Sequence, residues 1–272
     1  MIKKNLDVSL FKNKTITVAT PMSGGVAFTG YIRSVIELTK ICAENNIDLD
    51  FTFIFNESLI TRGRNHLTHL FLKSNRDYLF FIDADISFDP LDLLYMVQLA
   101  TLEKDKQIIC AVYPKKHINW DFIKKAEDFG LVKNKEDYKK YQSEFVLNHI
   151  ISKNNSLSKE IVFNTEEPLE VYQSGTGFML ISKDVFYKFK EKYPEQLYLD
   201  LQDGEEKVAF FDCKINPENK IYMSEDYMFC DYADKISIST WILPWVSLNH
   251  SGTFEFSGNF KEYSEELFKM RD

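Results

Sequence analysis

Short apolar runs alternate with helical stretches over the N-terminal part of the chain. The runs are rich in β-branched, aromatic or leucine residues, are typical of strands, and span residues 15–19, 49–55, 79–82 and 108–112. The intervening segments repeat apolar residues at helical spacing and span residues 28–43, 64–73 and 90–99. This βαβαβαβ order predicts an α/β fold, with a mostly parallel central sheet flanked by helices on both faces.

The alternation is interrupted at residues 115–167, a segment rich in Lys, Glu and Asn. Helical patterns at 121–129 and 136–150 predict a helical insertion there, and not a separate domain. Alternation then resumes. The elements expected in this second half are a strand at 178–181, helices at 184–193 and from residue 224, a strand at 236–241 and a terminal helix at 260–270.

Composition narrows the class of protein. With 272 residues, 44% of them hydrophobic, the chain can bury a large core. A net charge of -8 with dispersed acids argues against nucleic-acid binding, which needs a basic face. The 4 cysteines form no CxxC pair and indicate a reducing compartment, and no apolar stretch approaches the length of a transmembrane helix. We therefore expect a cytoplasmic protein, for which peripheral membrane association stays open and the oligomeric state is not predicted.

Residues 78–88, YLFFIDADISF, carry the strongest chemical signal. The apolar run reads as a buried strand that ends at Asp83-Ala84-Asp85, at the edge where open α/β sheets bind ligands. The two carboxylates would repel each other and lose hydration without a counter-charge. A divalent cation that carries a phosphorylated ligand would supply it. The alternative is a turn in which the Asp side chains cap backbone amides.

Other short motifs lie at element boundaries. Arg64, near the start of a predicted helix, adds planar donors where free amides and the helix dipole attract anions. The Gly-Thr-Gly at residues 175–177 permits tight backbone approach to a ligand, or forms a plain turn. Ser224 fits a helix N-cap, and acids after it suit the helix dipole in any case. His250 follows the late strand pattern.

Taken in this order, the motifs resemble nucleotide-sugar glycosyltransferases of the A-type fold (GT-A), in particular small family-2-like or Anp1-like enzymes of viral and bacterial type. In that family a Rossmann-like nucleotide-binding half ends in a DxD motif after a hydrophobic strand. The resemblance implies a single GT-A catalytic domain. Its implied parts are a nucleotide-binding half at about 14–113, the helical insertion at about 115–167, an acceptor half at about 168–258 and a C-terminal helix at about 260–272.

The resemblance implies a donor-binding set in the N-terminal half. Thr20 and Pro21, at the tip of the first strand, would contact the base or ribose, although a Pro-terminated strand end explains them equally well. Arg64 matches the family's ARN element, with Gly63 in place of the usual Ala. The donor-binding residues expected are Thr20, Pro21, Arg64, Asp83, Ala84 and Lys115.

The resemblance also implies a metal site. Asp85 and His250 would hold Mn²⁺ or Mg²⁺ against the diphosphate, and Asp83 would contact ribose or support the metal shell. A neutral imidazole is a better ligand for Mn²⁺ than for Mg²⁺. The alternative for His250 is a structural role beyond a strand.

Catalytic and acceptor residues are implied in the second half. Asp226 is the first choice and Glu225 the second for a base that accepts the proton of the acceptor hydroxyl in an inverting enzyme. In a retaining enzyme that carboxylate would position hydroxyl groups, and the sequence does not distinguish these outcomes. The acceptor or sugar contacts expected are Gly175, Thr176, Gly177 and Trp245, with core packing as the alternative for the tryptophan.

These features predict a metal-dependent glycosyltransferase that moves a sugar from a nucleoside diphosphate sugar to a hydroxyl of a glycan or glycoconjugate. One alternative is a haloacid-dehalogenase-like phosphatase with Asp83 as nucleophile. That family has Thr or Val two residues after the second Asp, where this chain has Ser87, and its DxD strand opens the fold. The other alternative is a non-catalytic nucleotide-sugar-binding protein. The donor sugar, the nucleotide, the acceptor and the linkage are not predicted.

Overall fold

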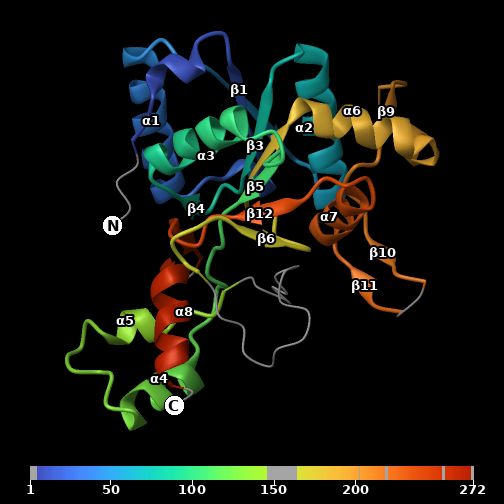
Figure 1. Cartoon of the computed structure of the whole chain (residues 1–272). Coiled ribbons are helices and arrows are strands. Elements are labelled where there is room, and N and C mark those ends of the chain that lie inside the picture. The colour runs from blue at the N-terminus through green and yellow to red at the C-terminus, as the bar shows by residue number, and fades with distance from the viewer. Residues whose placement is uncertain (1–4, 146–163, 202, 218–219, 253–254, 271–272) are drawn as a thin grey trace.

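A seven-stranded sheet forms the centre of the computed structural model, which describes residues 5–145, 164–201, 203–217, 220–252 and 255–270 (Figure 1). The strand order is β2-β1-β3-β7-β5-β12-β6. The strands are β1 (Thr15–Met22), β2 (Asp48–Phe55), β3 (Tyr78–Ile82), β5 (Ile108–Cys110), β6 (Leu169–Val171), β7 (Phe178–Ser182) and β12 (Thr240–Ile242).

The sheet is mostly parallel, which confirms the expectation from the alternating pattern. β1 pairs in parallel with β2 and β3, and β12 pairs in parallel with β5. β7, however, lies antiparallel between β3 and β5, and β6 is antiparallel to β12. The sequence did not predict these reversals, because an apolar run does not encode strand direction. A parallel connection needs a crossover, usually a helix, and the helices between β5 and β6 pack elsewhere.

Helices cover both faces of the sheet, as predicted (Figure 1). α1 and α3 pack on one face, and α2, α6 and α7 pack on the other. The helices are α1 (Thr29–Glu44), α2 (Ile60–Ser74), α3 (Pro90–Leu102), α4 (Trp120–Asp128), α5 (Tyr138–Tyr141), α6 (Lys183–Lys192), α7 (Glu225–Lys235) and α8 (Phe260–Lys269), with short 3-10 turns at Val8–Phe11, Ser23–Gly25 and Pro194–Gln196. Within the described ranges, none of these helices has the length and apolar character needed to cross a membrane.

Two predicted elements differ from the structure. The helix expected at 136–150 ends at Tyr141, because the chain after it pairs with other segments: Phe145 forms a bridge with Pro114, and Ser143 donates to the backbone carbonyl of Ser257. Residues 146–150 of that prediction lie outside the described residues. The strand expected at 236–241 forms only from Thr240, because α7 closes in a turn whose Ser237 has a φ of 62°.

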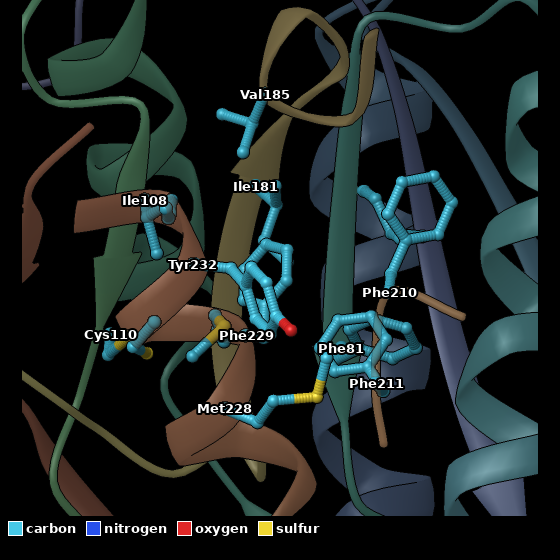
Figure 2. Packing of buried hydrophobic residues seen from close by; sticks show 14 of the residues in the cluster. Phe81, Ile108, Cys110, Ile181, Val185, Phe210, Phe211, Met228, Phe229 and Tyr232 are labelled. Carbon is cyan, nitrogen blue, oxygen red and sulfur yellow. The ribbon is translucent and has the colours of Figure 1, made fainter. Parts of the chain in front are cut away.

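Side chains of the central strands alternate between two hydrophobic clusters, one on each face. Leu79 and Phe81 of β3 belong to the cluster under α2, α6 and α7, whereas Phe80 faces α1 and α3. Figure 2 shows the first cluster, where the ring of Phe211 lies 5.3 Å from that of Phe81 and 4.6 Å from that of Phe229. Burial on both faces explains why the strand before the DxD motif is apolar throughout.

A second, three-stranded antiparallel sheet joins the DxD motif to the C-terminal part of the chain. It consists of β4 (Ile86–Ser87), β13 (Ser247–Ser251) and β14 (Glu255–Asn259) in the order β14-β13-β4. In its register, His250 lies opposite Ile86. Since β4 begins directly after Asp85, this pairing positions the C-terminal segment beside the motif.

The remaining elements lie at the periphery. Two antiparallel hairpins, β8–β9 and β10–β11, precede α7 (Figure 1). Their strands are β8 (Leu197–Leu199), β9 (Glu206–Val208), β10 (Lys214–Ile215) and β11 (Tyr222–Met223). The insertion helices α4 and α5 pack against α8 in a third cluster, in which the ring of Phe122 lies 5.2 Å from that of Tyr263.

Phe229→Ala is expected to lower the free energy of unfolding by about 3–5 kcal/mol, because it removes a fully buried ring and leaves a cavity. Chemical denaturation measures this change. The matched control is Phe129→Ala, whose ring is 52% exposed and whose loss should change stability by less than about 0.5 kcal/mol. Equal losses in both variants would contradict the core position of Phe229.

Candidate functional site

The carboxyl ends of β1, β2, β3 and β5 border a cavity of about 540 Å³. This volume falls in the range of about 300–1,000 Å³ that is usual for small-molecule sites, and ligands of open α/β sheets bind at this edge. The predicted site residues in the lining are Pro21, Arg64, Asp83, Ala84, Asp85, Thr176, Glu225 and Asp226. The fold therefore brings together most of the predicted residues, although they come from distant segments.

Arg64 is the buried cation of this cavity. It lies on α2 with only 3% of its surface exposed, and its guanidinium is 5.3 Å from the ring centre of Phe81. Its Nη2 donates to Asp83 Oδ1 at 3.0 Å, while Nε lies 3.5 Å from Glu225 Oε1, too far for a good hydrogen bond. Among the described residues, Nε and Nη1 have no hydrogen-bond partner. These buried donors favour an anionic ligand.

Neighbouring carboxylates favour the charged form of Arg64. Burial alone would lower its pKa, but the carboxylates of Asp83 and Glu225 raise it above the ordinary arginine value. The guanidinium therefore stays charged inside the cavity wall, and it can attract a phosphate as well as neutralise the acids.

Asp85 and His250 meet beside the cavity. Ser251 donates its backbone N–H to Asp85 O at 2.7 Å, and His250 Nε2 lies 3.3 Å from Asp85 Oδ1. His250 Nδ1 lies 2.8 Å from the carbonyl oxygen of Pro114. Because a carbonyl oxygen only accepts, Nδ1 carries a proton. Nε2 faces Asp85 and donates to the carboxylate when the ring is protonated, whereas a neutral ring would offer its Nε2 lone pair to a metal ion.

This pair fits the metal expected from the sequence. One carboxylate and one imidazole nitrogen form a donor set that suits Mn²⁺, with the remaining positions open to phosphate oxygens and water. Two ligand atoms at right angles on such an ion lie about 3 Å apart when each bond is about 2.1 Å. The 3.3 Å between Asp85 Oδ1 and His250 Nε2 is compatible with that spacing.

The cation beside Asp85 is Lys116, whereas Lys115, the predicted donor contact, pairs with Glu144. Lys115 Nζ lies 2.5 Å from Glu144 Oε1 and is not in the cavity lining, whereas Lys116 Nζ contacts Asp85 Oδ2. Burial would raise the pKa of Asp85, but hydrogen bonds and charge from His250 and Lys116 outweigh burial and lower it.

The two candidate bases lie in the first turn of α7 and line the cavity, as expected. Burial raises the pKa of Glu225, and the neighbouring charge of Asp226 raises it further, against the effect of Arg64. Asp226 Oδ1 accepts from the hydroxyl of Ser224 and from the backbone N–H of Tyr227. Ser224 stands at the N-cap position, but its side chain bonds Asp226 and not the helix backbone, which corrects the predicted cap.

Gly175 and Gly177 make room for a tyrosine ring, and not directly for a ligand. A Cβ at Gly175 would lie 2.4 Å from the Oη of Tyr113, and one at Gly177 would lie 2.7 Å from its Cζ. The ring of Tyr113 lines the cavity and packs edge-on against His250 at 5.4 Å. Burial raises the pKa of Tyr113 well above the ordinary value. The sequence analysis missed this residue, although its place just after a parallel strand is a usable signal.

Thr20 and Trp245, two other predicted ligand contacts, make contacts with other side chains of the protein. Thr20 is fully buried and its hydroxyl lies 2.6 Å from that of Tyr31, so that Pro21 and not Thr20 lines the cavity. Trp245 packs against Tyr95 with ring centres 6.3 Å apart, which matches the core-packing alternative.

An apolar lip borders the cavity and was also missed. Its members are Met22, Val26, Phe28, Leu59 and Ile60. Val26 is 63% exposed and Leu59 55%, so apolar surface gathers at the edge of the cavity.

The loop that carries part of this lip is held by an ion pair. Glu57 accepts from Arg62 at 2.5 and 2.8 Å, and it also accepts the backbone N–H of Leu59 at 2.9 Å. Arg62 thus orders the loop between β2 and α2.

One cluster of three potential metal ligands occurs elsewhere in the described residues: His66, Asp200 and Asp203. The ammonium of Lys207 contacts all three, at 3.1, 2.6 and 2.6 Å, and its side chain is 1% exposed. The Lys207 ammonium therefore supplies the positive charge that a metal ion would otherwise bring to these three residues.

Gly177→Ala is expected to lower the free energy of unfolding by about 1–3 kcal/mol, because its Cβ would overlap Tyr113 and lie 2.9 Å from Ile86 Cδ1. The matched control is Gly63→Ala on α2, where the new Cβ has no contact closer than 3.5 Å. It should be neutral or stabilising by up to about 1 kcal/mol through helix propensity. Thermal denaturation compares the two, and tolerance of Gly177→Ala would rule out the Tyr113 contact.

The chain matches no protein-family model and no curated protein. Among solved structures, it is similar to A197 from STIV, with a TM-score of 0.47 and 15% identity over 88% of this chain and 86% of that one. It is also similar to a glycosyltransferase involved in the glycosylation of the major capsid of PBCV-1, with a TM-score of 0.28 and 10% identity over 64% of this chain and 62% of that one. Likenesses this distant carry no argument about activity, so the functional conclusion has to rest on the residues of the site.

Proposed function

We propose that the protein is a metal-dependent glycosyltransferase that moves a sugar from a nucleoside diphosphate sugar to a hydroxyl of a glycan or glycoconjugate. The observation that carries the proposal is the meeting of Asp85 and His250, 3.3 Å apart, on the border of a cavity with a buried arginine. These residues are far apart in the sequence, and the pairing of β4 with β13 brings them together.

The diphosphate end of the donor is bound by positive charge. Asp85 and His250 would hold a Mn²⁺ or Mg²⁺ ion, which would supply a Lewis acid beside the diphosphate. Arg64 binds phosphate oxygens through its unpartnered Nε and Nη1, which are already desolvated. Asp83 keeps the guanidinium oriented through the 3.0 Å hydrogen bond to Nη2.

The nucleoside end lies on the apolar lip. Val26, Phe28 and Leu59 present exposed apolar surface beside Pro21, and a base can cover this surface with its flat faces. The ion pair of Glu57 with Arg62 holds this loop in place before the donor binds, which reduces the entropy lost on binding.

The acceptor hydroxyl is activated at the start of α7. Asp226, or Glu225 beside it, accepts the hydroxyl proton as the oxygen bonds to the anomeric carbon and the bond to the diphosphate breaks. The raised pKa of Glu225 makes it a stronger base than an ordinary glutamate. In a retaining enzyme the same carboxylates position the sugar hydroxyls.

Metal-enhanced nucleotide binding tests this proposal. Isothermal titration with a panel of nucleoside diphosphates should find at least one whose affinity rises about tenfold or more when Mn²⁺ is present. Asp85→Asn should abolish that enhancement, because the amide is a poorer ligand for the ion. Asp121→Asn, at an exposed position of α4, is the control and should keep it. If Mn²⁺ increases the affinity for none of the nucleotides, the proposal is wrong.

The base is tested separately. Asp226→Asn and Glu225→Gln should keep nucleotide binding within about twofold, whereas loss of the true base should lower turnover by about 10²–10⁴-fold. An Asn at 226 still accepts from Ser224 and Tyr227, so the local contacts survive. Turnover is measured as release of the nucleoside diphosphate. Phosphate release with a trapped phosphoaspartate at Asp83 would identify a phosphatase, and binding without turnover in the unsubstituted protein would identify a non-catalytic binder.

A further inference from the structure

Asp85 already has a positive partner within the chain. The Lys116 ammonium contacts Oδ2, on the opposite side of the carboxylate from the His250 contact at Oδ1. In the part of the chain that the structure describes, no other carboxylate lies within ion-pair distance of Lys116. The carboxylate proposed to hold a divalent ion is therefore engaged by a lysine.

An ammonium and a divalent cation compete for one carboxylate. Two positive charges about 4 Å apart repel each other, and they do so more strongly near a protein surface than in water. Lys116 thus has to leave Asp85, at least in part, when an ion binds there.

Other segments anchor the backbone around Lys116, whereas its ammonium is held by Asp85. Pro114 bridges to Phe145, and Lys115 donates its backbone N–H to Glu144 O at 2.6 Å. The Lys116 side chain is 37% exposed. A long flexible stem on a fixed base lets the ammonium move while it stays near the same carboxylate.

We propose that Lys116 competes with the metal ion for Asp85 and, once displaced, binds the diphosphate of the donor. This inference rests on the proposed function and adds an order of events to it. The ion alone binds weakly, because it leaves the Lys116 ammonium without a partner. A diphosphate supplies that partner, so that ion and nucleotide bind with positive cooperativity.

The test is Mn²⁺ affinity, read from the electron paramagnetic resonance signal of free Mn²⁺, first alone and then with the nucleoside diphosphate that the unsubstituted protein binds best. Lys116→Met should bind Mn²⁺ alone about tenfold more tightly. The gain in Mn²⁺ affinity caused by nucleotide should shrink by about tenfold or more. Lys124→Met is the charge-matched control, because the Lys124 ammonium pairs with Asp128 at 2.5 Å and not with Asp85. This variant should match the unsubstituted protein in both titrations.

The outcomes separate the two proposals. If the unsubstituted protein binds Mn²⁺ and nucleotide but Lys116→Met has equal or weaker Mn²⁺ affinity, the competition is wrong and the proposed function stands. If neither protein binds Mn²⁺, both proposals are wrong. Lys116→Gln removes the charge with less change in polarity, and it provides the same comparison if the Met variant fails to fold.

Discussion

The pairing of β4 with β13 is the interaction on which the site depends. It joins the two residues after Asp85 to the strand that carries His250, and the 2.7 Å hydrogen bond from Ser251 N to Asp85 O extends that pairing to the motif itself. Backbone hydrogen bonds hold a register far more firmly than side chains on loops. The closeness of a carboxylate and an imidazole from opposite parts of the chain thus follows from main-chain geometry.

Charge compensation is the second constraint. The cavity wall collects several acids around Arg64, and burial makes each charge costly unless a partner lies close. Asp83 and Glu225 share the guanidinium, while Asp85 is shared by His250 and Lys116. Arg64 and Lys116 offset only part of the charge of Asp83, Asp85, Glu225 and Asp226, while donor groups of Arg64 stay unused. A divalent cation bound together with a phosphorylated ligand would supply the missing positive charge and use these donors.

Local sequence patterns predicted those features that depend on neighbouring residues alone. The run before Asp83 identified a strand buried on both faces, and its acids identified the ligand edge. The direction of β7 and the early end of α5 depend on tertiary pairing, which no local pattern reports. Backbone pairing with residues 144–145 decides which of Lys115 and Lys116 turns toward the motif, and no local pattern reports that pairing. Tyr113 was missed since its role depends on distant glycines.

These constraints explain why the charged groups and the apolar groups of the site lie on different elements. Groups that bind charge lie where strands or helices begin and end, and rigid elements hold them to the small tolerances that phosphate and metal binding need. The apolar lip instead lies on the loops after β1 and β2, where Val26 and Leu59 can change without disturbing the sheet. In the proposed enzyme, the lip and the acceptor side would meet the variable parts of the substrates, so that changes there would alter specificity, while changes at Asp85, Arg64 or His250 would remove the chemistry itself.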